Sequence, residues 1–190
     1  MRGIAKYSII LAATLGLVVA GTSSSYATDT SGSDPIFMKI ADINGETTLT
    51  GYAGDIELDS FQFGIEHAVD LSASSGATAG KTTFSPIQIT KIMDKTSPAI
   101  FGKSTTGQVI PQVDIYFAKT TSKGLQTYAH YLLKNVIISS YSVSSGGDAP
   151  TESISLNFQS VQFEFSIANP DGTLSPFGTF KYDLSTNTAS

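Results

Sequence analysis

Apolar residues alternate with polar ones along most of this chain, and that two-residue period is the feature that most constrains its fold. A β-strand turns successive side chains to opposite faces, so each alternating stretch predicts a strand with one buried face. No repeat and no second kind of composition interrupts the pattern, which indicates one all-β domain. The alternating stretches are Ile36–Ile40, Asp55–Val69, Phe84–Ile92, Val109–Phe117, Leu125–Val143, Ile154–Ile167 and Phe177–Leu184.

Two of these stretches change phase part-way along. Apolar residues stand at even positions before Asp59-Ser60 and at odd positions after it, and the same change occurs at Gln159-Ser160. A slip of one residue would turn the wrong face inward unless a β-bulge absorbs it. Long strands that are each bent by a bulge are what a small closed β-barrel needs to turn its corners. The pattern therefore predicts such a barrel.

One stretch, DKTSPAIFGKSTTG from Asp94 to Gly107, lacks the alternation. Ser97 is a favourable N-cap residue, and Pro98 suits the first helical position because its missing N–H costs nothing there. We expect one short helix over Pro98–Thr105, lying against the barrel and forming the only sizeable helix of the domain.

The N-terminus has the features of a secretory signal peptide. Arg2 and Lys6 precede a short apolar core, Ile9–Ala20, and Ser25-Tyr26-Ala27 supplies small residues at the two positions that a signal peptidase reads. An apolar core of roughly 7–15 residues is typical of a signal peptide, whereas a membrane-spanning helix needs about 20. An uncleaved anchor is the alternative interpretation.

Cleavage is expected between Ala27 and Thr28, which divides the chain into a signal peptide (1–27), a short linker (28–35) and one domain (36–187). The mature chain would carry 9 Lys and Arg against 16 Asp and Glu, a formal charge of −7, which argues against nucleic-acid binding. It has no Cys, so its stability must come from core burial rather than from disulfides, and assembly can add to it. We expect an exported protein, periplasmic or extracellular, with no membrane contact after cleavage.

No catalytic, cofactor or metal site can be assigned from the sequence. Gly102-Lys103-Ser104 resembles the end of a P-loop, but Ser97 stands where the pattern requires glycine. The stretch Asp42–Glu46 is more typical of a hairpin turn at Asn44-Gly45, where positive φ is tolerated, than of a calcium loop. His67 and His130 have no clustered partner in the sequence that would indicate a zinc site or a catalytic dyad.

Several stretches together resemble the Hcp family, the haemolysin-coregulated tube proteins of type VI secretion. The resemblance extends from Ile36 to about Asn187, and it rests on the order and spacing of the stretches rather than on one motif. They are FMKIADINGET (37–47), DIELDSFQFGI (55–65), GKTTFSPIQITKIMDKTSPAIF (80–101), YLLKNVIISSYSVSSGG (131–147), TESISLNFQSVQFEF (151–165) and GTFKYDL (178–184).

This resemblance implies a β-barrel subunit without a catalytic centre, assembled into hexameric rings. Such rings stack into a tube that a contractile sheath expels, and they can carry effector cargo in the lumen. In the family the loop after the second strand projects from one face of the ring and meets the next ring. The matching residues here are Ser72, Ala73, Ser74, Ser75, Gly76, Ala77, Thr78, Ala79, Gly80 and Lys81.

The signal peptide departs from the family pattern, because these tube proteins are normally loaded from the cytoplasm. A chain with a signal peptide would fold outside the inner membrane, away from the sheath and baseplate. The sequence therefore predicts an exported, Hcp-like structural protein that forms rings or filaments, with secretion components or effector cargo as further partners. The alternative is a monomeric exported binding module, an adhesin or sugar binder that uses Tyr128, Tyr131 and Tyr141.

Overall fold

The structure is a computed structural model that describes residues 34–71 and 78–190, all within one compact unit, Gly32–Ser190. The described residues form β-strands and one helix, as the alternation predicts. In chain order these are β1 (Ile36–Ile40), β2 (Ile56–Leu58), β3 (Ser60–Gln62), β4 (Ile65–Asp70), β5 (Thr78–Phe84), β6 (Ile87–Ile92), α1 (Ser97–Thr106), β7 (Ile110–Thr121), β8 (Gly124–Ser144), β9 (Thr151–Asn157), β10 (Ser160–Ala168), β11 (Leu174–Asp183) and β12 (Thr188–Ala189).

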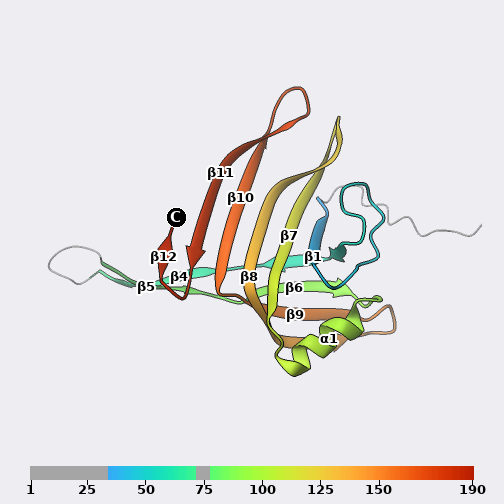
Figure 1. Ribbon diagram of the computed structural model, residues 1–190, viewed down its shortest axis with the longest axis horizontal. Coiled ribbons are helices and arrows are strands. Elements are labelled where there is room, and N and C mark those ends of the chain that lie inside the picture. Colours follow the sequence, from blue (N-terminus) through green and yellow to red (C-terminus); the bar gives the residue numbers. More distant parts are fainter. Residues whose placement is uncertain (1–33, 72–77) are drawn as a thin grey trace, which may run out of the picture. The chain divides into compact units, whose positions relative to one another are not determined.

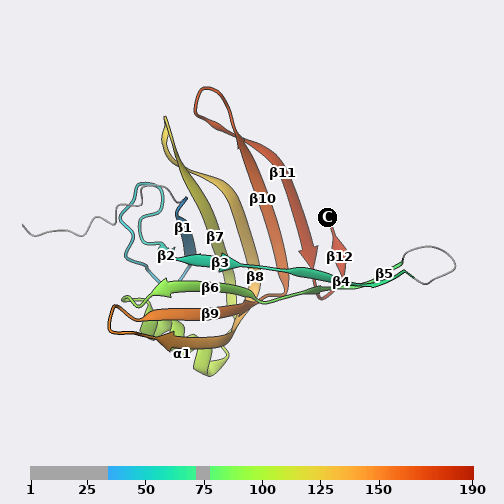
Figure 2. The ribbon, with the colours of Figure 1, turned by 180° about the vertical axis from the view of Figure 1, so that it is seen from behind.

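Two antiparallel layers share the long strand β8 (Figure 1). The first layer has the order β12-β11-β10-β8-β7-β1-β2, and the first half of β8 belongs to it. The second half of β8 pairs with β9, which continues to β6 and β3. Asn135, with φ of 50°, lies where β8 passes from one set of partners to the other. Strands β6 and β9 run across the direction of β7, β10 and β11 in both views (Figures 1 and 2).

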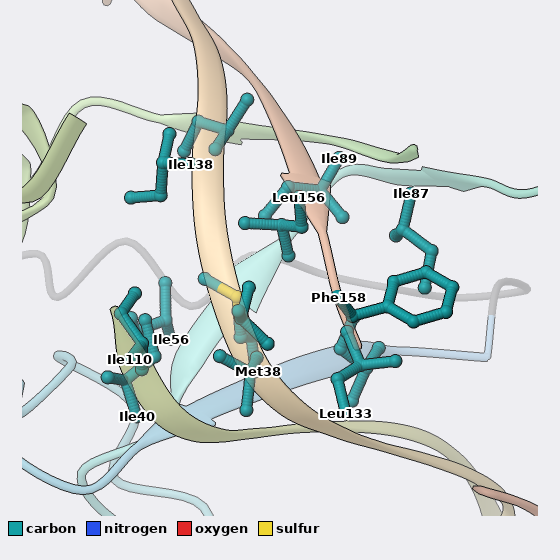
Figure 3. Close-up of a cluster of buried hydrophobic side chains, with 14 of the residues drawn as sticks. Met38, Ile40, Ile56, Ile87, Ile89, Ile110, Leu133, Ile138, Leu156 and Phe158 are labelled. Atoms are coloured by element: carbon teal, nitrogen blue, oxygen red, sulfur yellow. The ribbon is translucent and has the colours of Figure 1, made fainter. Parts of the chain in front are cut away.

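The core lies between these two layers (Figure 3). Met38, Ile40 and Leu133 from the first layer point toward Ile89 and Leu156 from the second, and all five are at most 2% exposed. Burial of one such side chain contributes about 1.5–3 kcal/mol, so a core of this kind stabilises the fold without disulfides.

Both predicted phase changes lie where the chain turns a corner, but each is a break between two strands with different partners and not the predicted β-bulge within one strand. At Asp59 the chain ends β2 and begins β3, and the Asp59 N–H donates to the Thr90 carbonyl at 2.8 Å. At Gln159 it leaves β9 in the second layer and enters β10 in the first, where the Gln159 N–H donates to the Lys134 carbonyl at 3.0 Å. The change of phase keeps apolar side chains facing the core on both sides of each corner.

The strand pairing does not show the predicted closed barrel. Among residues 34–71 and 78–190, β2 pairs with β1 and β3 pairs with β6, and no ladder is continuous across Asp59. At the opposite end of the first layer, β12 pairs with β11 alone, which leaves an open edge. A phase change reveals where the chain bends, but closure of the barrel depends on long-range strand pairing, which alternation does not encode.

The helix lies where the sequence predicts it, with its N-cap one residue earlier. Thr96, not Ser97, is the N-cap, because the Ser97 hydroxyl accepts the Asp94 N–H at 3.0 Å and lies 3.2 Å from Lys91 Nζ. The helix ends at Gly107, whose φ of 62° is the left-handed conformation that glycine favours.

The stretch around Asn44-Gly45 is not the predicted hairpin turn. It lies in the long segment between β1 and β2, and neither residue has positive φ. Glycine is needed at 45 for close approach, since an added Cβ would lie 1.9 Å from the Asp55 carbonyl oxygen. Asp42 forms an ion pair of 2.7 Å with Lys103 of α1, so this segment is attached to the helix.

Candidate assembly surface

Strands β4 and β5 form a two-stranded ribbon, here called the arm, that projects beyond the edge of the first layer (Figures 1 and 2). Ile65, Val69 and Leu71 on the arm are exposed, and Leu71 is 78% exposed. A ribbon of two strands has no second layer on which to bury such side chains. The arm therefore offers apolar surface to a partner.

Part of the loop predicted over Ser72–Lys81 is a strand. Residues 72–77 lie outside the described residues, but Thr78, Ala79, Gly80 and Lys81 belong to β5. Thr78 pairs with Asp70 and Ala79 with Val69 across the arm. The loop was expected from the family resemblance, but residues 78–81 pair in a ladder, which needs only backbone N–H and C=O groups. Gly80 also lies close to the opposite strand, where an added Cβ would be 3.2 Å from the Ala68 carbonyl oxygen.

A second apolar surface lies on the hairpin of β10 and β11, here called the hairpin face. Phe165, Ile167, Phe177 and Phe180 are all exposed there, Phe177 by 73%. Phe180 stands opposite Phe163 in the ladder. A monomeric protein rarely exposes this many large apolar side chains together, so the hairpin face is a candidate contact surface.

A groove of about 370 Å³ separates the root of the arm from the hairpin face. Its walls are almost entirely aromatic and aliphatic. The lining residues are Phe63, Gly64, Ile65, Phe84, Tyr131, Val161, Phe163 and Phe180.

The side of the first layer that faces away from the core carries a continuous polar chain. His130 on β8 lies between two carboxylates: its Nε2 is 2.9 Å from Asp114 on β7, and its Nδ1 is 3.2 Å from Glu164 on β10. Gln112 donates to Asp114 at 2.7 Å, and Lys134 donates to Gln112. Burial alone would lower the pKa of His130, but the two carboxylates outweigh it and raise that pKa above its usual value.

Sequence reasoning missed this chain of contacts. His130 is 16 residues from Asp114 and 34 from Glu164, so no local motif connects them. Alternation gives the face of each residue within its strand, but the contact also requires the strand register. Within the described residues, no cluster has the geometry of a metal site.

Comparison with known proteins shows the family. A model described as "Type VI secretion system effector, Hcp" matches residues 37–165, more than half of the chain. The chain belongs to the Hcp family. "Protein hcp1" of Pseudomonas aeruginosa is 30% identical over 139 residues, which cover 72% of this chain and 86% of that protein. "Major exported protein" of the same species is 29% identical over 95 residues, and the match spans about half of each protein (50% and 54%).

Solved structures share the fold. One titled "Structure of a type six secretion system protein" superposes with a TM-score of 0.77 at 24% identity, over 83% of this chain and 99% of that chain. Hcp1 from Salmonella typhimurium gives 0.67 at 24% identity, over the same shares. As an Hcp protein the chain is a structural subunit of the type VI secretion tube and has no enzymatic role.

The Hcp-like stretch KIMDKTSP forms a buried polar junction beneath α1. Lys91 on β6 stands opposite Glu152 on β9, and their charged groups are 2.6 Å apart with both side chains fully buried. Lys91 Nζ also lies 2.9 Å from Asp94, while the Tyr141 hydroxyl donates to Glu152 at 2.5 Å. Burial alone would raise the pKa of Asp94, but hydrogen bonds from Thr96 and Lys91 outweigh it and lower that pKa. The junction fixes α1 to the second layer.

The tyrosines of the alternative sugar-binding interpretation do not form one site. Tyr131 stacks on Phe163 on the core side of the first layer. Tyr141 lies at the other end of β8, where its ring packs edge-on against Phe101 of α1. Tyr128 packs near Phe165. Lys103 of the rejected P-loop-like stretch is buried and pairs with Asp42.

Within residues 34–71 and 78–190, no helix has the length and apolar character needed to cross a membrane.

Proposed function

We propose that this Hcp-family chain is exported, assembles into hexameric rings through the arm and the hairpin face, and stacks its rings through the stretch Ser72–Lys81. The observation that supports this is the presence of two exposed apolar surfaces on different parts of one chain. Val69 and Leu71 lie on the arm, whereas Phe177 and Phe180 lie on the hairpin face. An arm of one copy that packs on the hairpin face of the next makes a heterologous contact, and such contacts close into rings or continue as filaments.

The open seam at Asp59 is compatible with a barrel-like subunit. Strands β2 and β3 together act as one bent strand, with β2 on β1 and β3 on β6. We propose that this bent strand gives the domain the closed form expected for the family.

Export is supported by the signal-like N-terminus and by the name of the Pseudomonas relative, "Major exported protein". The proposal includes cleavage between Ala27 and Thr28, although this segment lies outside the described residues. The intact mass of protein recovered outside the cytoplasm tests it directly. An intact mass equal to that of the chain starting at Met1 would contradict cleavage.

Ring formation is tested with a matched pair of variants. Val69→Asp places a charge on the arm, and Val109→Asp places the same charge on an exposed valine just after α1. Burying an unpaired charge in an interface is strongly unfavourable. Light scattering and electron microscopy should show rings for the parent and for Val109→Asp, but monomers for Val69→Asp. If both variants assemble like the parent, the arm is not part of the ring contact.

Ring stacking is tested separately by deleting Ser74–Thr78 from the proposed stacking stretch. Several copies of this stretch would meet the next ring at once, so weak single contacts can add through multivalency. The shortened protein should fold and form rings but no longer stack into tubes. Stacking as efficient as that of the parent would show that this stretch is a passive connection. A strictly monomeric parent would instead favour the binding-module interpretation.

A further inference from the structure

A second cavity lies on the polar side of the first layer. It has a volume of about 400 Å³ and separates the segment between β1 and β2 from strands β1, β7 and β8. Its walls include Tyr52 and Asp55 of that segment, Lys39 of β1, Tyr116 of β7 and Gln126 of β8. It is large enough for one side chain or a small organic molecule.

Asp55 makes this cavity unusual. Its side chain lines the cavity, and the residue is only 5% exposed. Within the described residues its carboxylate receives no hydrogen bond and has no cation within ion-pair distance, although Lys39 lies near enough to influence it. Burial of an unpaired carboxylate is costly, and burial raises the pKa of Asp55 accordingly. The site is therefore ready to accept a positively charged hydrogen-bond donor.

Two further side chains of the cavity, Tyr116 and Gln126, offer oxygen atoms that can accept a hydrogen bond. No described residue forms a hydrogen bond with the Tyr116 hydroxyl, and burial together with Asp114 and Asp55 raises its pKa to about 12, so it stays protonated. Gln126 uses its amide N–H groups on Thr121 and Gly172, which leaves its carbonyl oxygen as an acceptor. The rings of Tyr52 and Tyr116 meet edge to face at 6.1 Å, so the wall that they form is aromatic.

We infer that this cavity binds an alkylammonium group, such as the end of a lysine side chain, with Asp55 as its counter-ion. An ammonium group has three N–H donors and no acceptor, which complements Asp55, Tyr116 and Gln126. Aromatic rings nearby add a cation–π contribution. An anion is disfavoured, because Asp55 would repel it and Asp114 lies close enough to act on Asp55 as a second negative charge. Among the described residues of the cavity wall, only Lys39 carries a positive charge that could attract an anion. This binding site is independent of the proposed ring and tube assembly.

Lys39 should oppose the binding of an ammonium group, whereas Asp55 should favour it. Lys39 lines the same cavity, is exposed, and is the cation among the described residues that acts most strongly on Asp55. An incoming ammonium group has to bind in the presence of that charge. Removing the Lys39 charge should therefore strengthen binding, whereas removing the Asp55 charge should weaken it.

The test is a chemical-shift titration of the purified full chain with Nα-acetyl-lysine N-methylamide, and in parallel with butylammonium. Both probes carry the ammonium group, so comparison separates recognition of a lysine residue from recognition of any small amine. We expect saturable shifts around the cavity with a Kd of about 1–10 mM for a single small cation. The acetylated probe Nα,Nε-diacetyl-lysine N-methylamide, which lacks the charge, should not bind.

Three variants and a matched control decide the outcome. Asp55→Asn should weaken binding at least about tenfold and Tyr116→Phe by a smaller factor, since hydrogen bonds to charged groups contribute more than neutral ones. Lys39→Gln should strengthen binding. Asp148→Asn, an exposed acid in the β8–β9 connection, should leave it unchanged. If Asp55→Asn does not fold, Tyr116→Phe and Lys39→Gln still give opposite predicted signs. No saturable shift, or equal binding of charged and acetylated probes, would overturn the inference.

Discussion

Replacing Lys91 by methionine should destabilise the domain strongly. Lys91 and Glu152 are fully buried and 2.6 Å apart, so the variant leaves a buried carboxylate without its cation. Removal of one partner from a buried pair costs about 3–5 kcal/mol. Glu152 keeps the hydrogen bond from Tyr141, which favours the lower end of that range. About 3 kcal/mol corresponds to a fall in Tm of roughly 6–12 °C for a domain of this size.

The double variant Lys91→Met/Glu152→Leu isolates the reason. It removes both charges and fills the junction with apolar side chains, which is often neutral or stabilising relative to a buried pair. Asp94 retains its hydrogen bonds from the Thr96 backbone N–H at 2.8 Å and hydroxyl at 2.5 Å. We therefore expect the double variant to recover most of the lost stability, with a coupling free energy of about 2 kcal/mol or more between the two positions.

Urea unfolding followed by circular dichroism measures these effects, since a change in midpoint at constant m reports a change in stability. Assembly makes apparent stability depend on concentration, so each variant is measured at several protein concentrations. A cost of less than about 1 kcal/mol for Lys91→Met would contradict a strongly coupled buried pair. So would a double variant that is as unstable as the losses of Lys91→Met and Glu152→Leu added together, because the two charges would then act independently.

Three further predictions concern local contacts. His130 has a raised pKa in the folded state, so the stability it contributes is complete below its unfolded pKa of about 6.5 and is lost as pH rises through the folded value. The fall in Tm between pH 6 and pH 9 should be smaller in His130→Asn, and an equal fall in both proteins would count against the ion pairs. Gly45→Ala should destabilise by about 2 kcal/mol or more, because its Cβ would meet backbone atoms of Asp55 at 1.9 and 2.3 Å. Gly102→Ala, in a helix and with nothing within 4 Å of the new Cβ, should stabilise by up to about 1 kcal/mol in the same urea assay; a loss at Gly102 as large as that at Gly45 would refute the steric reasoning.

Local features of the sequence were the easiest to predict. Strand β1 begins and ends at Ile36 and Ile40 as expected, because alternation depends only on neighbouring residues. Pro98 marked the helix for the same reason, since its fixed φ acts within one turn. The N-cap is Thr96 and not Ser97, because the Ser97 hydroxyl accepts a hydrogen bond from Lys91, six residues earlier on β6.

The strand boundaries within longer alternating stretches were predicted less accurately. The one strand expected over Asp55–Val69 is three strands, with breaks at Asp59 and at Phe63-Gly64. Beyond the second break, β4 leaves the core layers and pairs with β5 as the arm. The apolar residues Ile65 and Val69 continue the alternation but are exposed. Alternation identifies apolar side chains that favour burial, but it does not say whether they are buried within the same chain or against another chain.

The sequence by itself determined the fold class, the bounds of β1, the place of the helix and the two corners, since each follows from side-chain period or from a residue's own backbone preference. Only the tertiary structure decided which distant side chains meet. Lys91 finds Glu152 across 61 residues, and His130 lies between Asp114 and Glu164 from two other strands. These contacts, like the cavity at Asp55, depend on strand register and on which layer each strand joins. Both are set by the packing of the whole core, where one shift of register would turn every side chain of a strand to the opposite face.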